Sequence, residues 1–315
     1  MVKDRGQTLK KTAFIVNSIA TRSSAAGWRR VQSYINGNGY SPGDVKLTES
    51  VGQATLLARG AVIAGYEMVV AVGGDGTVNE VVNGLFSNGT VPDRSLILGV
   101  IPLGSGCDLA RSLRIPSDTV EAVKAVENNG TRRIDLGRAE FVNLNGEREK
   151  RVFINIADLG GGGLVVQKAN RAPRILGRRP NYLWGILAAA ITYKARMVHV
   201  SVDGREPARL AMKNLIIANG EYFGRGFHAA PQAKMDDGLF DIINVGVFGT
   251  LEGLRNVPKL YKGTHLDLDK VTFLRGRKVE ARSDEEVLLE MDGELVGKLP
   301  ATFEVIPDAI NITAR

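Results

Sequence analysis

The sequence contains little cysteine, little histidine and no long hydrophobic run. Cys107 is the only cysteine in 315 residues, so no disulfide can form within the chain and a reducing cytoplasm suits it. The three histidines, His199, His228 and His265, lack the spacing of zinc ligands. No apolar run approaches the ~18 residues that a membrane-spanning helix needs, and the N-terminus has no apolar signal-peptide core. We therefore expect neither a disulfide framework, nor a zinc site, nor a transmembrane segment.

The bulk composition is that of a globular protein with an excess of basic residues. Hydrophobic residues make up 44% of the chain and charged residues 24%, which is ordinary, whereas aromatic residues reach only 6%. The length is sufficient for two domains that each bury a core. The formal net charge of +7 suits nucleic acid, an anionic membrane or a polyanionic substrate, and does not choose among them.

One stretch, residues 66–86, dominates the first half of the chain. The apolar run 68–72 is typical of a strand buried on both faces. Thr77 and Glu80 fit the capping box T-x-x-E, which predicts that a helix starts there. Free backbone N–H groups and the helix dipole would then attract an anion. Between strand and helix lie Gly73, Gly74, Asp75 and Gly76.

The same turn is also compatible with a βα connection that binds nothing. Two named phosphate-binding motifs are excluded. A dinucleotide-binding fingerprint would need glycine where Asn79 stands, and a Walker A loop would need serine or threonine where Leu299 follows Gly297-Lys298.

A second glycine loop, Pro102–Arg111 (PLGSGCDLAR), again follows an apolar strand and precedes a helix. Ser105 is predicted to cap that helix, with Asp108 three residues further on. Two such junctions in one parallel sheet would place two helix N-termini at its carboxyl edge, where a triphosphate could lie between them. The alternative is that Gly104 and Gly106 only form a turn.

Strands and helices alternate from residue 12 to about residue 130, which predicts an α/β nucleotide-binding domain with a largely parallel sheet. After Asp135 the strand-like runs follow one another closely and predict a mainly β-sandwich domain, interrupted by a helix at 181–194. We place the domains at 1–137 and 138–306, and leave open whether 307–315 returns to the first domain.

Three acidic positions could carry chemistry. Asp75 would face phosphate, which calls for a bridging cation such as Mg²⁺, unless Asp75 only braces its own turn. Asp237, in the segment 231–241, could hold a cation together with neighbouring carbonyls. Glu294, in Met291-Asp292-Gly293-Glu294, could act as a general base on a hydroxyl. Both Asp-Gly segments are equally consistent with plain hairpins.

Taken together, these motifs resemble the catalytic-domain family of diacylglycerol kinases, soluble bacterial lipid kinases related to sphingosine kinases. The resemblance runs from about Lys11 to Pro307. GGDGT alone is shared with NAD kinases, but its combination with PLGSG and a late DGE is specific. It is carried by GGDGTVNEVVNG (Gly73–Gly84), PLGSGCDLAR, NIADLGGGG (Asn155–Gly163), DDGLFD (Asp236–Asp241) and MDGE.

The resemblance implies ATP and Mg²⁺ as cofactors, with the active site in the cleft between the domains. Glu294 would be the catalytic base, and Asp75 would lie near the metal. A structural Mg²⁺ would be bound by Asp237 with the carbonyls of Lys234 and Leu239. The nucleotide would be bound by Asn17, Thr48, Gly73, Gly74, Asp75, Gly76, Thr77, Asn79, Glu80, Gly104, Ser105 and Gly106.

Two departures from the family pattern put part of this site in doubt. The first-strand turn keeps Asn17 but continues Ser18-Ile19-Ala20-Thr21 instead of the usual Pro and Gly. Cys107 replaces the usual asparagine. We leave open whether either weakens ATP binding.

The predicted activity is transfer of the γ-phosphoryl group of ATP to a lipid hydroxyl, chiefly that of diacylglycerol. Alternatives are a sphingoid-base or other lipid kinase, an NAD kinase, and a non-catalytic lipid-binding regulator. A cytoplasmic protein acting at the inner membrane face is expected, with no nucleic-acid partner. The basic stretch 168–179 before the apolar residues 182–187 would dock on anionic lipid, or else is a solvated loop. A homodimer is compatible with the sequence, which does not reveal the oligomeric state.

Overall fold

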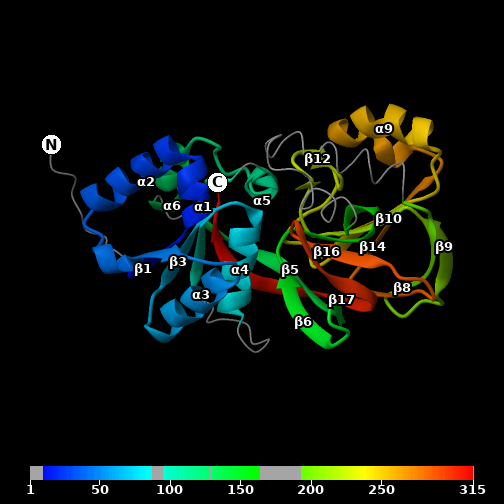
Figure 1. Cartoon of the computed structure of the whole chain (residues 1–315), viewed down its shortest axis with the longest axis horizontal. Coiled ribbons are helices and arrows are strands. Elements are labelled where there is room, and N and C mark those ends of the chain that lie inside the picture. The colour runs from blue at the N-terminus through cyan, green and yellow to red at the C-terminus, as the bar shows by residue number, and fades with distance from the viewer. Residues whose placement is uncertain (1–9, 87–94, 105, 128–129, 164–192, 315) are drawn as a thin grey trace. The chain divides into compact units, whose positions relative to one another are not determined.

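The computed structural model describes residues 10–86, 95–104, 106–127, 130–163 and 193–314 (Figure 1). Contacts between residues divide the chain into two compact units. The first unit comprises Met1–Gly104, Arg114–Arg133 and Ile310–Arg315, and the second comprises Ser105–Leu113 and Ile134–Ala309. The functional domain boundaries at 137/138 and 306/307 stay a prediction.

The first unit is an α/β structure around a parallel sheet. The sheet order is β17–β4–β3–β1–β2, and every neighbouring pair is parallel. This confirms the predicted parallel sheet, and the last strand-like segment of the chain supplies its edge through Asn311 and Ile312. Its other strands are β1 (Thr12–Asn17), β2 (Val45–Thr48), β3 (Met68–Gly73) and β4 (Ile97–Pro102). Its helices are α1 (Ser18–Ser23), α2 (Ala25–Gly37), η1 (Pro42–Asp44), α3 (Gln53–Ile63), α4 (Asp75–Leu85) and α6 (Thr119–Glu127).

Helices cover both faces of this sheet, as Figure 1 shows for α2 and α6 on one face and α3 and α4 on the other. All six residues of β3 and all six of β4 are buried, which explains their uninterrupted apolar sequences. Val31 and Ile35 of α2 pack with Val123 and Val126 of α6 against alternate residues of β1 and β3. Gly84 lets α4 approach α3 closely, because a Cβ there would lie 2.3 Å from the carbonyl oxygen of Thr55.

The second unit is built mainly of antiparallel strands, which confirms the predicted β domain. One path runs β14–β13–β10–β7–β16–β17, and β9, β8 and β15 join it at β17. The strands are β5 (Thr131–Asn143), β6 (Arg148–Phe153), β7 (Ile156–Gly160), β8 (Arg196–Val202), β9 (Ala208–Met212), β10 (Asn214–Ala218), β11 (Tyr222–Phe223), β12 (Phe227–His228), β13 (Phe240–Val245), β14 (Val271–Gly276), β15 (Lys278–Arg282), β16 (Leu288–Met291) and β17 (Glu294–Thr313). Its helices are α5 (Asp108–Ser112), α9 (Thr250–Lys262) and η4 (His265–Asp267).

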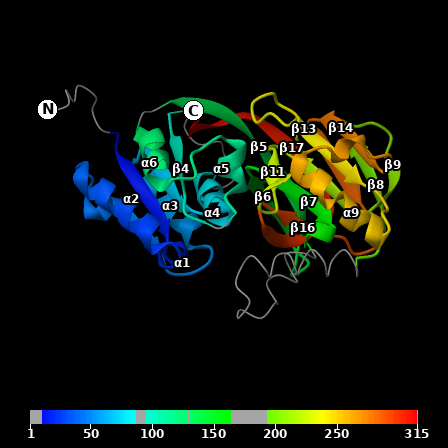
Figure 2. The same cartoon turned by 90° about the horizontal axis from the view of Figure 1, so that it is seen from above.

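The two faces of the sheet that contains β7, β10 and β13 bury different cores. Ala157 and Leu159 of β7 enter a large cluster with Phe153, Phe240 and Phe303. Ile156, one residue out of phase, enters a smaller cluster against which Leu260 of α9 packs (Figure 2). The sequence did not predict α9, which contains no fully buried residue and has Pro258 in its interior. The predicted helix 181–194 lies outside the described residues except for Tyr193 and Lys194, which belong to no regular element.

Candidate active site

The predicted nucleotide residues of the first unit lie at one edge of its sheet. Strand β1 ends at Asn17, which is in register with Thr48 at the end of β2. Strand β3 ends at Gly73, in register with Pro102 at the end of β4. These are the carboxyl ends of four neighbouring parallel strands, the edge at which α/β sheets bind ligands. The fold therefore brings together residues that are up to 85 positions apart, as the separation of Asn17 and Pro102 shows.

The first glycine loop leads directly into helix α4. The helix begins at Asp75, and its N-cap is Gly74, so the predicted cap at Thr77 is wrong by three residues. Thr77 lies inside the first turn, where its buried hydroxyl accepts a hydrogen bond from Asn17 Nδ2 at 2.9 Å. Gly73 is required because a Cβ there would lie 2.5 Å from Thr77 Oγ1. The turn is thus built around Thr77, with the N–H groups of the first helical turn at the sheet edge.

Glu80 does not form the predicted capping box. Its two carboxylate oxygens accept hydrogen bonds from the backbone N–H groups of Gly52 and Ala54, at 2.9 and 3.0 Å. These groups lie at the start of α3, whose N-cap Gly52 has no side chain to satisfy them. Glu80 therefore caps a neighbouring helix instead of its own. Its role in nucleotide binding stays a prediction.

The second glycine loop lies beside the first. Leu103 N donates to Gly73 O at 2.8 Å, and a Cβ on Gly74 would meet the Cα of Gly104 at 3.5 Å. Ser105 lies outside the described residues. Helix α5 begins only at Asp108, after Cys107 in a left-handed conformation with φ 56°. The predicted cap with Asp108 in the third helical position is therefore wrong, because Asp108 is the first residue of the helix.

The donor set at this sheet edge fits a magnesium nucleotide. Asp75 is half-buried in the first turn of α4, where the helix dipole favours an anion. Mg²⁺ in nucleotide sites takes one or two carboxylates and obtains its other oxygens from phosphate and water. Asp75 is the carboxylate that the loop supplies, and its binding of Mg²⁺ stays a prediction.

In the second unit, Met291-Asp292-Gly293-Glu294 forms a tight hairpin between β16 and β17. Asp292 and Gly293 both have positive φ, 48° and 92°, as a two-residue hairpin of type I′ requires. The hairpin reading of this segment is thus confirmed, and it is compatible with a role for Glu294 at the exit. The Asp292 carboxylate accepts three backbone hydrogen bonds, from Ile154, Asn155 and Ile156, at 2.9 to 3.0 Å. Sequence reasoning missed this anchor.

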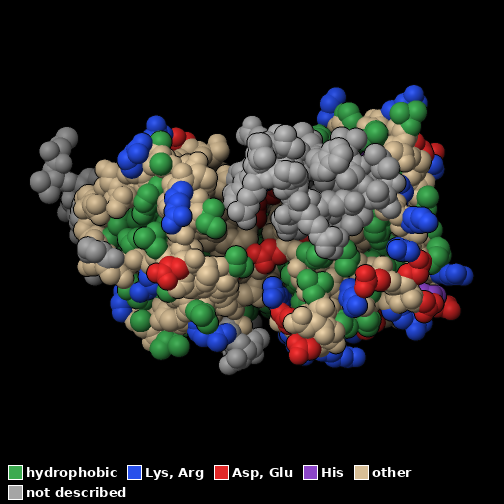
Figure 3. Space-filling model, viewed as in Figure 1, with side chains coloured by type: hydrophobic (Ala, Val, Ile, Leu, Met, Phe, Trp, Pro, Cys, Tyr) green, Lys and Arg blue, Asp and Glu red, His purple; other side chains and the backbone are tan. Residues whose placement is uncertain are grey.

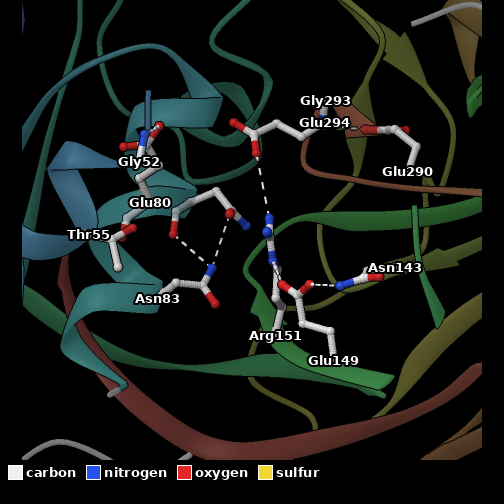
Figure 4. A network of polar contacts seen from close by, with 11 residues as sticks. Gly52, Thr55, Glu80, Asn83, Asn143, Glu149, Arg151, Glu290, Gly293 and Glu294 are labelled. Atoms are coloured by element: carbon white, nitrogen blue, oxygen red, sulfur yellow. Dashed lines mark hydrogen bonds and ion pairs between the residues drawn. The ribbon is translucent and has the colours of Figure 1, made fainter. Parts of the chain in front are cut away.

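Glu294 lies at the start of β17 in a strongly charged neighbourhood (Figure 4). Its side chain is 34% exposed, and its Oε2 lies 4.0 Å from Arg151 Nη1. The guanidinium of Arg151 is itself held by Glu149, at 2.5 Å from Nε to Oε1. Asn143 Nδ2 donates to the other oxygen of Glu149 at 3.1 Å. Glu294 is therefore accessible to a substrate and lies near a cation of fixed position.

The proposed structural metal ligands lie in the turn between Lys234 and Leu239. Asp237 Oδ1 accepts a hydrogen bond from Leu239 N at 3.1 Å, and Oδ2 contacts Arg275. Arg275 Nε also binds the buried Asp241, at 2.8 Å. Arg275 thus supplies positive charge where a divalent cation would sit, so these residues fit a cation only if the guanidinium moves away. Metal binding by Lys234, Asp237 and Leu239 stays a prediction.

Comparison with known proteins agrees with this geometry. Residues 11–139 match the diacylglycerol kinase catalytic domain. Residues 156–314 match the YegS C-terminal NAD kinase beta sandwich-like domain. A Bacillus subtilis protein named diacylglycerol kinase is 32% identical over 81% of this chain and 80% of its own length. A Staphylococcus epidermidis protein of the same name is 30% identical over 84% of this chain and 79% of its own length.

Solved structures share the fold. A Bacillus anthracis protein described as a candidate diacylglycerol kinase superposes with a TM-score of 0.79 at 23% identity, covering 100% of this chain and 99% of its own. An Archaeoglobus fulgidus NAD kinase, solved in complex with ATP, gives a TM-score of 0.52 at 16% identity over 96% of this chain and 93% of its own. The sequence relationships show that the chain belongs to the diacylglycerol kinase family and is a kinase. Within the described residues, no helix is long and apolar enough to cross a membrane.

Proposed function

We propose that this kinase transfers the γ-phosphoryl group of ATP to the hydroxyl of diacylglycerol. The observation that carries the proposal is the pairing of the two glycine loops at the ends of β3 and β4, with Gly74 and Gly104 in van der Waals reach. Two glycine-rich loops at the same sheet edge leave room for phosphate groups beside the backbone. The names of the relatives, diacylglycerol kinase, support a lipid hydroxyl as the acceptor.

In this proposal, the residues of the first unit hold the nucleotide and Glu294 activates the acceptor. The N-terminus of α4 and the loop 73–76 would bind phosphate oxygens, and Asn17 and Thr48 would contact the nucleotide at the adjacent strand ends. Asp75 would hold a Mg²⁺ ion, which supplies positive charge to the phosphate oxygens when bound. Glu294 would take the proton from the lipid hydroxyl. Arg151 Nη1 lies 4.0 Å from Glu294 Oε2 and supplies a positive charge beside this carboxylate.

The decisive experiment offers radiolabelled ATP to a panel of acceptors: diacylglycerol, sphingoid bases, phosphatidylglycerol and NAD. Labelling of diacylglycerol above all others is expected. Glu294→Gln should retain the fold and lower turnover by about a hundredfold to ten-thousandfold, the usual contribution of a general base. Glu286→Gln is the matched control, because Glu286 is exposed and pairs with Lys298 at 3.2 Å. Labelling of NAD alone would overturn the assignment of a lipid as the acceptor. Near-normal turnover of Glu294→Gln would show that Glu294 is not the general base.

A kinase that acts on diacylglycerol must reach it at a bilayer surface. The basic stretch 168–179 lies outside the described residues. Helix α9 offers a second basic surface, over which Figure 3 shows lysine, arginine and hydrophobic side chains. Arg255, Lys259 and Lys262 are exposed at helical spacings of four and three, in line with Leu251, which is 62% exposed. The proposed partner of this face is an anionic bilayer at the inner membrane surface.

Vesicle co-sedimentation tests this contact. Replacing Arg255, Lys259 and Lys262 by glutamine should reduce binding to vesicles that contain phosphatidylglycerol. The matched control replaces Arg205, Arg209 and Arg282, which are also exposed. An equal effect of both triple variants, or binding that does not depend on the lipid charge, would contradict docking through α9.

Light scattering on the protein without vesicles decides whether the chain is a homodimer.

A further inference from the structure

Two carboxyl groups lie side by side in the interior of the second unit. Asp158 on β7 and Glu290 on β16 are directly opposite each other in the antiparallel register. Directly opposed residues point to the same face of a sheet, with Cβ atoms about 4.5–5.5 Å apart. The exposed fractions are 0% for Asp158 and 3% for Glu290. Asp158 belongs to the motif NIADLGGGG, but no role was predicted for it or for Glu290, and the proposed phosphoryl transfer uses neither acid.

The environment of the pair is crowded and provides few hydrogen-bond donors. Asn214 Nδ2 donates to Asp158 Oδ2 at 3.1 Å, whereas Asp158 Oδ1 is buried with no hydrogen-bond partner among the described residues. A Cβ on Gly162 would lie 1.9 Å from the Asp158 carboxylate, so only glycine fits over it. Glu290 accepts a hydrogen bond from Gly293 N. In the part of the chain that the structure describes, neither acid is paired with a lysine, arginine or histidine.

The charged groups that face the pair make double ionisation unfavourable. Burial raises the pKa of Asp158 to about 7. Burial, and then the charge of Asp158, hold the pKa of Glu290 well above its ordinary value, and Asp292 and Glu294 add to this. On the other side, Tyr193 faces Asp158, and Arg196 and Glu285 face Tyr193. Two like charges without a cation between them cannot both persist in such a site.

We propose that Asp158 and Glu290 hold one proton between them and that this acid pair positions Glu294. The inference rests on the proposed function for the role of Glu294 as base. Glu290 binds the N–H of Gly293, the residue immediately before Glu294. Asp292, on the other side of the turn, is held by three backbone N–H groups. The turn that presents Glu294 is therefore fixed from both sides, and the shared proton keeps a second buried charge away from the base.

Four variants separate the hydrogen bond from the charge. Glu290→Gln keeps an acceptor for Gly293 N and removes the acid. Glu290→Leu removes both. Asp158→Asn combined with Glu290→Gln removes every titration of the pair. Glu286→Gln, two residues before β16 and exposed, is the control.

Two measurements on the intact protein test the shared proton without any substrate. Infrared difference spectra at about pH 7 should show a protonated carboxyl that is lost in the double variant. A native pKa above the unfolded one means that the wild type loses stability as pH rises from about 4 through about 7. The melting temperature of the double variant minus that of the wild type should therefore increase with pH. A difference that stays flat or falls with rising pH, or a missing infrared band, overturns the shared proton.

Positioning is tested by amide exchange and by kinetics. Exchange of the Gly293 amide should accelerate at least tenfold in Glu290→Leu and stay near wild type in Glu290→Gln. With the best acceptor of the wild type, Glu290→Leu should lower kcat at least tenfold with an unchanged KM for ATP. Glu290→Gln should keep kcat within about threefold. Asp158→Asn combined with Glu290→Gln should move the acidic limb of the pH–rate profile to lower pH, because the one negative charge that the pair retains is gone.

The outcomes distinguish this inference from the proposed function. If Glu294→Gln turns over normally, the base assignment fails, while exchange at Gly293 still decides whether Glu290 holds the turn. Equal kcat for Glu290→Leu and the Glu286→Gln control, with unchanged exchange at Gly293, overturns positioning even if Glu294 is the base. An unmoved pH–rate profile in the double variant Asp158→Asn/Glu290→Gln would overturn the effect of the pair's charge on Glu294.

Discussion

Asn17 Nδ2 donates a hydrogen bond to Thr77 Oγ1 at 2.9 Å, joining the end of β1 to the first turn of α4. The same side chain accepts hydrogen bonds from Ile19 N and Ala20 N, at 2.9 and 3.0 Å, and so caps α1. One amide thus connects two helix N-termini at the sheet edge that we assign to the nucleotide. Although the turn after Asn17 departs from the family pattern, the residue that it retains has a defined structural role.

Replacing Asn17 should affect both stability and nucleotide binding. Asn17→Ala removes a cap and a side-chain hydrogen bond, each of which contributes about 1 kcal/mol, so the free energy of unfolding should fall by roughly 2 kcal/mol. Asn17→Asp retains the cap but adds a negative charge at the proposed phosphate site. It should therefore destabilise less than Asn17→Ala and raise the KM for ATP more. Urea denaturation and ATP titration measure the two effects, and an unchanged KM in both variants would remove Asn17 from the nucleotide site.

Glu80 should act chiefly through helix α3. Glu80→Ala leaves the N–H groups of Gly52 and Ala54 without their acceptors, which should lower the free energy of unfolding by about 1–3 kcal/mol. Glu121→Gln is the control, because the exposed pair of Glu121 with Lys124 should contribute less than about 0.5 kcal/mol. Chemical denaturation measures both variants. Loss of ATP affinity in Glu80→Ala without loss of stability would instead support the predicted nucleotide contact.

Sequence patterns predict the strands and helices of the first unit, but they do not predict the distant contacts of Glu80. The alternation of apolar strands and amphipathic helices correctly predicts the parallel sheet, because a strand buried on both faces must be apolar throughout. The T-x-x-E pattern is read from local spacing, whereas Glu80 binds residues 26 and 28 positions away. Local spacing cannot reveal which distant backbone groups lack an acceptor.

The candidate site shows the same limit. The glycines of both loops are recognisable because close backbone approach and helix starts have a sequence signature. Glu290 lies in a run that reads as ordinary strand sequence, and Asp158 lies in the motif NIADLGGGG, for which no role was predicted. Only the pairing of β7 with β16 makes them neighbours. Arg275 likewise meets Asp237 and Asp241 through the pairing of β13 with β14. Strand register, which the sequence does not specify over such separations, decides these contacts.

We predict that the guanidinium of Arg275 takes the place of a divalent cation beside Asp237. Arg275→Met leaves the buried Asp241 without its charged partner, which should lower the free energy of unfolding by about 1–3 kcal/mol. If Asp237 then binds Mg²⁺, added MgCl₂ should raise the melting temperature of the variant and leave that of the wild type unchanged. Differential scanning fluorimetry with Mg²⁺ or EDTA makes the comparison, with Lys270→Met as a control for loss of an exposed cation. A melting temperature of the wild type that falls in EDTA would show that a metal is held there despite Arg275.

His265 should make the second unit sensitive to acid. It is 3% exposed, its Nε2 lies 3.0 Å from the carbonyl oxygen of Ala229, and its Nδ1 has no partner among the described residues. Burial lowers the pKa of His265, and the charge of the nearby His228 acts in the same direction, while the Ala229 carbonyl and Asp267 oppose them.

A native pKa below the unfolded value of 6.5 means that the unfolded chain binds more protons as pH falls below 6.5. Stability is therefore present above that pH and is lost below it, by at most about 1.4 kcal/mol per pH unit. Urea midpoints at about pH 7.5 and about pH 5.5 should differ less for His265→Gln, whose amide can still donate to Ala229, than for the wild type or the His199→Gln control. An equal loss in all three proteins would show that His265 is not the group that responds.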